Sequence, residues 1–115
     1  MGSGDSLLYH NPRCSKSRQA LALLQERGVQ PRIVEYLNQP PSEAELKHLL
    51  TMLGLKPRDI LRAKEAAEAG LDPQMSNAEL IQGIAGNPAV LERPIFVHGG
   101  KAVVGRPPEK VLDLL

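Results

Sequence analysis

The sequence contains a single cysteine, no tryptophan and few other aromatic residues, and each shortage excludes a class of protein. With Cys14 alone, the chain cannot form an internal disulfide or a thiolate-rich metal site. Aromatic residues make up 3% of the chain, too few for the stacking surface on which single-stranded nucleic acids bind. His10, His48 and His98 lack the spacing of metal ligands. We therefore expect no metal site and no direct contact with nucleic acid.

Strong charge and long apolar segments are also lacking. The net charge is +1 over 115 residues, which gives no reason to expect a nucleic-acid or membrane partner. No apolar run approaches the ~20 residues that a membrane span needs. One unpaired cysteine is typical of a reducing compartment, so we expect a cytoplasmic protein. The length suits one domain, residues 1–115, with one core.

The cysteine is expected at the junction of a strand and a helix. Residues 6–10 form an apolar run typical of a short buried strand. Apolar residues then recur at helical spacing over residues 15–27, and Gly28 ends the pattern. The unpaired amides of the first helical turn would point at the Cys14 sulfur and at any anion that it contacts.

This placement predicts a lowered pKa for the Cys14 thiol. Only the thiolate is a nucleophile, and both a helix N-terminus and nearby cations stabilise it. Arg13, Lys16 and Arg18 lie within four residues, and His10 lies four residues upstream. The alternative is that Cys14 is a small buried hydrophobic residue, as a lone cysteine often is. Its polar and cationic neighbours favour the reactive thiol.

The remaining pattern predicts two further parts of the fold. Residues 32–37 read as a second strand, which completes a βαβ unit with a parallel strand pair. Residues 42–92 read as a helical insert that contains two capping boxes, Ser42 with Glu45 and Ser76 with Glu79. Within it, the charged and alanine-rich residues 62–68 are expected to be a mobile surface segment.

The C-terminal third predicts a hairpin and a closing helix. Residues 94–98 and 101–105 read as strands joined by Gly99-Gly100, a pair typical of a two-residue hairpin loop. The sum is an α/β protein with a thioredoxin-like four-strand mixed sheet (βαβ plus ββα). In this layout a proline opens the third strand and faces the reactive thiol. We therefore predict that the Arg93–Pro94 peptide bond is cis.

Three arginines lie at the ends of predicted elements: Arg62, Arg93 and Arg106. Arginine forks bind tetrahedral oxyanions, and cations beside a thiolate would offset its repulsion of an anionic electrophile. The alternative for any single arginine is a solvated surface position. Arg93 and Arg106 both lie beside prolines at strand ends, which favours a functional role for these two.

Spacing excludes two familiar kinds of cysteine enzyme. A cysteine phosphatase needs an arginine six positions after the cysteine, and position 20 is Ala20. A dithiol oxidoreductase needs Cys-x-x-Cys, and position 17 is Ser17. Cys14 has no resolving partner in the chain, so a redox cycle would need an external thiol.

Three motifs together resemble the glutaredoxin-dependent arsenate reductases: His10-Asn11-Pro12-x-Cys14-x-x-Ser17-Arg18, Arg93-Pro94-Ile95 and Gly105-Arg106-Pro107. The resemblance implies that the Cys14 thiolate attacks arsenate, that glutathione then adds to arsenic as co-substrate, and that glutaredoxin completes the reduction to arsenite. No bound cofactor is implied. The resemblance also implies the roles of the site residues. Oxyanion ligands would be Arg62, Arg93 and Arg106, while the thiol environment would be tuned by His10, Asn11, Ser17 and Arg18.

Two functions therefore stay open. The first is an arsenate reductase, or a relative that acts on a similar oxyanion or on a glutathione mixed disulfide. The second is a regulatory binding protein of the same superfamily, for example an RNA polymerase partner, that uses Cys14 weakly or not at all.

Overall fold

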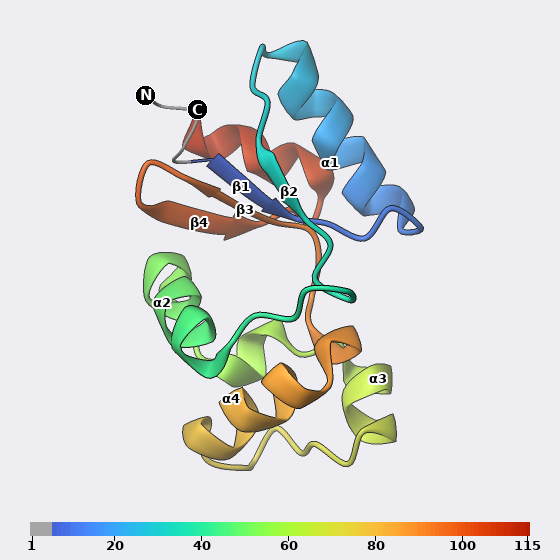
Figure 1. The fold of residues 1–115 in the computed structure, drawn as a ribbon, viewed down its shortest axis with the longest axis vertical. Coiled ribbons are helices and arrows are strands. Elements are labelled where there is room, and N and C mark those ends of the chain that lie inside the picture. Colours follow the sequence, from blue (N-terminus) through green and yellow to red (C-terminus); the bar gives the residue numbers. More distant parts are fainter. Residues whose placement is uncertain (1–5) are drawn as a thin grey trace. The chain divides into compact units, whose positions relative to one another are not determined.

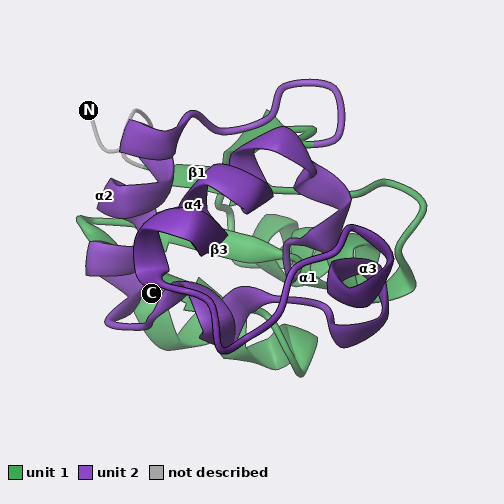
Figure 2. Ribbon diagram, turned by 90° about the horizontal axis from the view of Figure 1, so that it is seen from below, with its two compact units in different colours: residues 1–36, 93–115 green, residues 37–92 purple. Residues whose placement is uncertain are grey.

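The computed structural model describes residues 6–115, which divide into two compact units. The first ends at Tyr36 and resumes at Arg93–Leu115, and the second is Leu37–Glu92 (Figure 2). We call them the sheet unit and the helical unit. The helical unit contains the insert expected over residues 42–92. That the whole chain is one domain stays a prediction.

The sheet unit contains four strands, β1 (Ser6–Tyr9), β2 (Arg32–Val34), β3 (Ile95–His98) and β4 (Lys101–Val104), in the order β2-β1-β3-β4 (Figure 1). The β1–β2 pair is parallel and the other two pairs are antiparallel. Helix α1 (Ser15–Glu26) connects β1 to β2. This is the mixed sheet of a thioredoxin-like fold, as the sequence predicts.

Strand β2 is shorter than the predicted strand over residues 32–37. Its parallel partner β1 ends at Tyr9, which pairs with Val34. Beyond this pair only the amide of His10 continues the bonding, to the Val34 carbonyl at 2.9 Å. With no strand left to pair with, the chain turns away, and Leu37 is 45% exposed. The strand pattern was correct in position and wrong in length.

The core of the sheet unit lies between the sheet and two helices. Leu8 of β1 pairs in register with Phe96 of β3, so the two side chains share one face of the sheet. Helix α1 and the closing 3₁₀ helix η4 (Pro108–Leu114) add apolar side chains to the same cluster. Its fully buried members are Leu8, Ala20, Leu24, Phe96 and Val111.

The helical unit consists of α2 (Glu43–Leu53), η2 (Pro57–Ile60), α3 (Ala63–Glu68), α4 (Asn77–Gly86) and η3 (Pro88–Val90). Both predicted capping boxes are confirmed: Ser42 caps α2 and Ser76 caps α4, each with reciprocal hydrogen bonds to the glutamate at N3. Gly54 ends α2 with a left-handed φ of 68°. No helix between residues 6 and 115 is long and apolar enough to cross a membrane.

One segment of this unit was expected to be mobile. Residues 62–68 include helix α3 and are mostly exposed, and their mobility stays a prediction. Alanine has the highest helix propensity, and one alanine, Ala66, is 2% exposed and so anchors the helix. The chain before the helix is also held, because Leu61 forms an isolated antiparallel bridge with Leu91.

Candidate functional site

Strand pairing brings three distant segments of the chain to one end of the sheet. Tyr9, the last residue of β1, lies opposite Ile95, the first residue of β3. Ile95 in turn lies opposite Val104, the last residue of β4. The residues that follow β1, precede β3 and follow β4 therefore meet at this edge. These residues include Cys14, Arg93 and Arg106.

Cys14 is the N-cap residue of α1, with an extended backbone (φ −93°, ψ 123°). Its amide donates to the Asn11 carbonyl at 3.0 Å, and its carbonyl accepts from the Arg18 amide at 3.0 Å. The side chain is partly exposed, and Nη2 of Arg106 lies 4.0 Å from its Sγ. The sulfur therefore lies where a helix N-terminus and a guanidinium group both favour negative charge.

The pKa of the Cys14 thiol is lowered, which confirms the prediction. Partial burial raises this pKa, but several groups that stabilise the thiolate outweigh the burial. The largest of these is a hydrogen bond from the backbone amide of Ser17, followed by one from the Arg93 side chain and one from the amide of Lys16. The charge of Arg93 lowers the pKa further.

The source of the positive charge differs from the one expected. Arg13, Lys16 and Arg18 are all exposed, and none of their side-chain charges is among the causes of the lowered pKa. Arg18 instead donates from Nη1 to the Pro12 carbonyl at 2.9 Å and so holds the turn before the helix. The positive charge that lowers the Cys14 pKa comes from Arg93, which is distant in the sequence, and not from the sequence neighbours of Cys14.

The Arg106 side chain is hydrogen-bonded to the backbone of Arg93, and the two guanidinium groups have different partners. Nε of Arg106 donates to the Arg93 carbonyl at 2.9 Å, and the Gly105 amide donates to the Pro94 carbonyl at 2.8 Å. The Nε of Arg93 is buried and has no hydrogen-bond partner among residues 6–115. A buried donor without a hydrogen-bond partner is costly.

Two prolines mark this part of the site. The Arg93–Pro94 bond is cis, as predicted from the layout of the fold. The Arg106–Pro107 bond is cis as well, which sequence reasoning missed. Gly105, also missed, lies against Pro94, because a Cβ there would come within 2.9 Å of Pro94 Cγ. The motif Gly105-Arg106-Pro107 contains both residues, but the sequence analysis used only its arginine.

His10 and Ser17 form a buried polar pair beneath the cysteine turn. His10 is 6% exposed and Ser17 is fully buried. Nδ1 of His10 lies 2.6 Å from the Ser17 Oγ, which also accepts from the Asn11 amide at 3.1 Å. Burial lowers the pKa of His10, opposed by the Glu35 charge and assisted by the Arg18 charge. His10 is therefore a neutral partner of Ser17 near neutral pH.

Asn11 shapes the turn itself. Its side-chain Oδ1 accepts from the Arg13 amide at 3.0 Å, and its carbonyl accepts from the Cys14 amide. An asparagine that bonds the backbone two residues on is a common turn former. The thiol-tuning roles expected of His10, Asn11, Ser17 and Arg18 stay predictions, and all four lie in the sheet unit with Cys14.

Arg62 belongs to the helical unit, where it precedes α3. Its Nε lies 3.3 Å from Glu65 Oε1, and its Nη1 lies 3.5 Å from Glu92 Oε1. Its amide also donates to the Val90 carbonyl at 2.7 Å. The expected role of Arg62 as an oxyanion ligand stays a prediction.

These features define a class of thiol protein. A lone cysteine caps a helix on a thioredoxin-like sheet, and arginines from two other segments surround its sulfur. Residues 9–114 match the model of the ArsC family, and the chain belongs to this family.

Relatives support this assignment over nearly the whole chain. An "Arsenate reductase" of Neisseria meningitidis is 50% identical over 94% of this chain and 96% of its own. A protein of Escherichia coli K12 named "Uncharacterized protein YfgD" is 48% identical over 94% of both chains. The solved structure of a "Putative arsenate reductase" from Yersinia pestis matches with a TM-score of 0.89 and 48% identity, over 95% of this chain and 99% of that one.

Proposed function

We propose that this protein is an arsenate reductase in which Cys14 is the nucleophile. The observation that carries the proposal is the position of the Cys14 sulfur, at the N-terminus of α1 and 4.0 Å from Nη2 of Arg106. A thiolate held this way can accept an anionic electrophile, because the surrounding positive charge offsets the repulsion between the two. The buried Nε of Arg93 adds a donor suited to an oxyanion.

In the proposed reaction the Cys14 thiolate attacks the arsenic of arsenate. A sulfur–arsenic bond forms and an arsenate oxygen leaves as water. Glutathione replaces a second oxygen, so that arsenic carries two thiolates and is still As(V). The thiol of glutaredoxin then attacks the glutathione sulfur, a glutaredoxin–glutathione mixed disulfide forms and leaves, and the electron pair of the broken sulfur–arsenic bond reduces arsenic to As(III). Hydrolysis of the remaining bond releases arsenite and restores Cys14.

External thiols are part of the proposal because the chain has one cysteine. A second thiol must therefore resolve the first adduct, and glutathione and glutaredoxin fit that role. The proposal assigns Arg93 and Arg106 to the oxyanion and to the charge that develops during attack. It assigns His10, Asn11, Ser17 and Arg18 to the shape and protonation of the cysteine turn.

The test is NADPH oxidation coupled through glutathione reductase, glutathione and glutaredoxin, with arsenate as substrate. We expect arsenate-dependent turnover in the wild type and in Ser15→Ala, a neighbouring exposed position. Cys14→Ser should reduce turnover to background. A parallel assay with thioredoxin and thioredoxin reductase identifies the electron donor, and we expect little turnover there. No turnover with either donor, in a folded protein, would contradict the proposal and favour the regulatory alternative.

Arg62 requires its own test, because it pairs with two carboxylates in the helical unit. If it is the third oxyanion ligand, Arg62→Gln raises the KM for arsenate, while Glu92→Gln does not. If both variants lower the melting temperature and neither changes KM, Arg62 is structural and its assignment to the oxyanion is wrong.

A further inference from the structure

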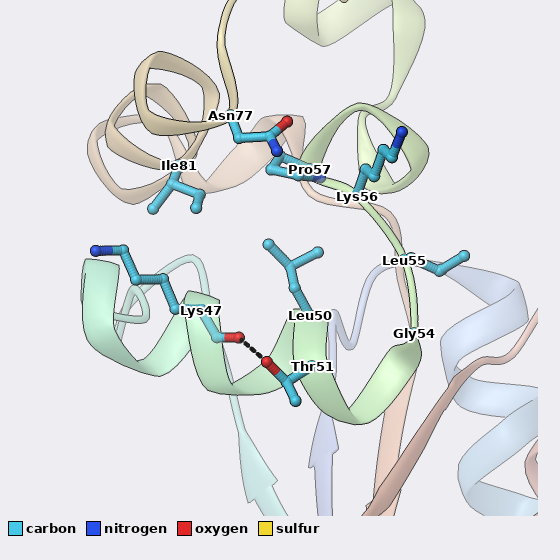
Figure 3. Close-up of a pocket in the computed structure, with 9 residues that line it drawn as sticks. All are labelled: Lys47, Leu50, Thr51, Gly54, Leu55, Lys56, Pro57, Asn77 and Ile81. Carbon is cyan, nitrogen blue, oxygen red and sulfur yellow. Dashed lines mark hydrogen bonds between the residues drawn. The ribbon is translucent and has the colours of Figure 1, made fainter.

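The helical unit contains a hollow that the proposed chemistry does not use. It has a volume of about 430 Å³ and lies between the C-terminal half of α2, the following link and the start of α4 (Figure 3). The residues that line it are Lys47, Leu50, Thr51, Gly54, Leu55, Lys56, Pro57, Asn77 and Ile81. We call these nine residues the α2–α4 groove. All of them belong to the helical unit.

The groove has an apolar floor. Leu50 and Ile81 point toward each other across it, and Pro57 lies beside them (Figure 3). Leu55, in the link, is 39% exposed and is one of three large hydrophobic side chains so exposed among residues 6–115. Its side chain points away from Leu50 and Ile81 and so lies at the edge of the hollow (Figure 3).

The rim of the groove is positively charged. Lys47 and Lys56 line it, and none of the nine lining residues is acidic. Neither ammonium group forms an ion pair with any residue from 6 to 115, where the two salt bridges both belong to Arg62. The one acidic side chain bonded at this link, Asp59, accepts from the backbone amide of Lys56. Two unpaired cations beside apolar floor residues complement acidic groups that flank an apolar residue.

Several polar groups of the groove already have partners within the chain. Gly54 and Leu55 both donate to the Leu50 carbonyl, at 2.9 and 3.3 Å. The Thr51 hydroxyl donates to the Lys47 carbonyl at 3.0 Å. Apolar contact, the two lysines and the Asn77 side chain remain for recognition.

The exposure of the groove decides between a small molecule and a protein segment. Small-ligand sites enclose about 70–90% of the ligand surface. Here six lining residues are exposed, which are Lys47, Thr51, Gly54, Leu55, Lys56 and Asn77. An open groove of this kind is better suited to a linear segment that lays a few apolar side chains into it.

We propose that the α2–α4 groove is a docking site for an acidic amphipathic segment of a partner protein. One or two apolar side chains of the segment contact Leu50, Leu55 and Ile81. Acidic residues on either side of them pair with Lys47 and Lys56. The interaction is expected to weaken with added salt, because rim charges are screened.

A phage-displayed library of random 12-residue peptides, selected against the whole protein, tests this proposal. We expect enriched peptides to carry Asp or Glu on both sides of Leu, Ile, Phe or Trp. Fluorescein-labelled copies are then titrated by anisotropy against the wild type and three variants. Lys47→Glu with Lys56→Glu, and separately Leu55→Ser, should weaken binding by about tenfold or more. Lys64→Glu, an exposed lysine of α3 outside the groove, should change binding less than twofold.

Several results would overturn the proposal. Enriched peptides that lack acidic residues, or that bind the double charge-reversal variant as well as the wild type, would contradict it. So would a selection in which no peptide rises above background. Sedimentation of the wild type that shows self-association, lost in Leu55→Ser, would assign the groove to a second copy of this chain. Displacement of the peptides by millimolar decanoate, with no salt dependence, would assign it to a small amphiphile. Matching circular dichroism melts confirm that each variant is folded.

Discussion

The sheet unit and the helical unit bury different kinds of side chain. The buried polar residues Ser6, His10 and Ser17 all lie in the sheet unit. Within residues 37–92 the fully buried positions are apolar. Buried polar groups require partners. Ser6 finds its partner far away in the chain, Nδ1 of His98 at 2.8 Å, whereas His10 and Ser17 partner each other within the cysteine turn.

The two units also form in different ways. The helical unit is organised by local signals, such as the capping boxes and the glycine that ends α2. The sheet unit joins the two ends of the chain, and its site exists only after β1, β3 and β4 have paired. Comparable substitutions in the two units should therefore lower stability in either unit, but should lower activity only in the sheet unit.

The largest expected difference between the units is in catalysis. Arg93→Gln and Arg106→Gln should each lower kcat/KM for arsenate about 10–100-fold, because a hydrogen bond to a charged group contributes about 1.5–3 kcal/mol. Arg58→Gln, at an exposed arginine of the helical unit, should change it less than twofold. Steady-state kinetics in the coupled assay measure all three. Equal losses in the three variants would contradict the assignment of the site to the sheet unit.

Two glycines provide a comparison of packing. In Gly105→Ala the new Cβ would meet Pro94 Cγ at 2.9 Å and Val111 Cγ1 at 3.0 Å. We expect a loss of about 1–3 kcal/mol in the free energy of unfolding, as overpacking usually costs. Gly86→Ala, at the end of α4, meets nothing within 4 Å and should be neutral or stabilising by up to about 1 kcal/mol. Urea denaturation measures both, and similar values for the two variants would show that Gly105 is not tightly packed.

Two serines compare a buried network with an exposed cap. Ser17→Ala removes the partner of His10 Nδ1 and of the Asn11 amide, and should cost about 1–3 kcal/mol because it leaves buried groups unsatisfied. Ser76→Ala removes the N-cap of α4 and should cost about 1 kcal/mol. Ser17→Ala should also raise the pKa of Cys14, if its side chain positions its amide. Ser76→Ala should leave the pKa of Cys14 unchanged. A change of the Cys14 pKa in Ser76→Ala would contradict the expected difference between the two serines.

The smallest expected effect is a pH dependence that arises from His10. Burial lowers the pKa of His10 below its ordinary value of 6.5, so the unfolded chain binds a proton more readily than the folded one. The free energy of unfolding should therefore fall as pH decreases below 6.5, and level off below the folded pKa. Urea denaturation between about pH 7 and 5 should show a smaller slope in His10→Asn than in the wild type. His48→Gln, at an exposed position of α2, should keep the wild-type slope.

The parts of the fold that sequence predicts well are those with local causes. Ser42 with Glu45 fixes the start of α2, and Gly99-Gly100 fixes the hairpin with φ values of 60° and 81°. The cis Arg93–Pro94 bond was predicted from the thioredoxin-like layout and not from a local signal. The end of β2 could not be predicted, because it depends on where the partner strand stops.

For the candidate site too, the features with local causes could be predicted and the others could not. The position of Cys14 at the start of a helix follows from local pattern, and so does the contribution of the helix amides to its pKa. The identity of the cation that lowers that pKa does not follow from local pattern, because Arg93 comes close to the thiol only when the strands have paired. Arg13, Lys16 and Arg18 are closer in sequence, but all three are exposed and none of their charges is among the causes of the lowered pKa.

The most direct test of the account is a titration of the Cys14 thiol. The rate of alkylation by iodoacetamide, or the ultraviolet absorbance of the thiolate, is followed against pH in the wild type and in Arg93→Gln. We expect an apparent pKa below the ~8.5 of a free cysteine, and a higher value in the variant. A wild-type pKa at or above that of a free cysteine, unchanged by Arg93→Gln, would contradict it.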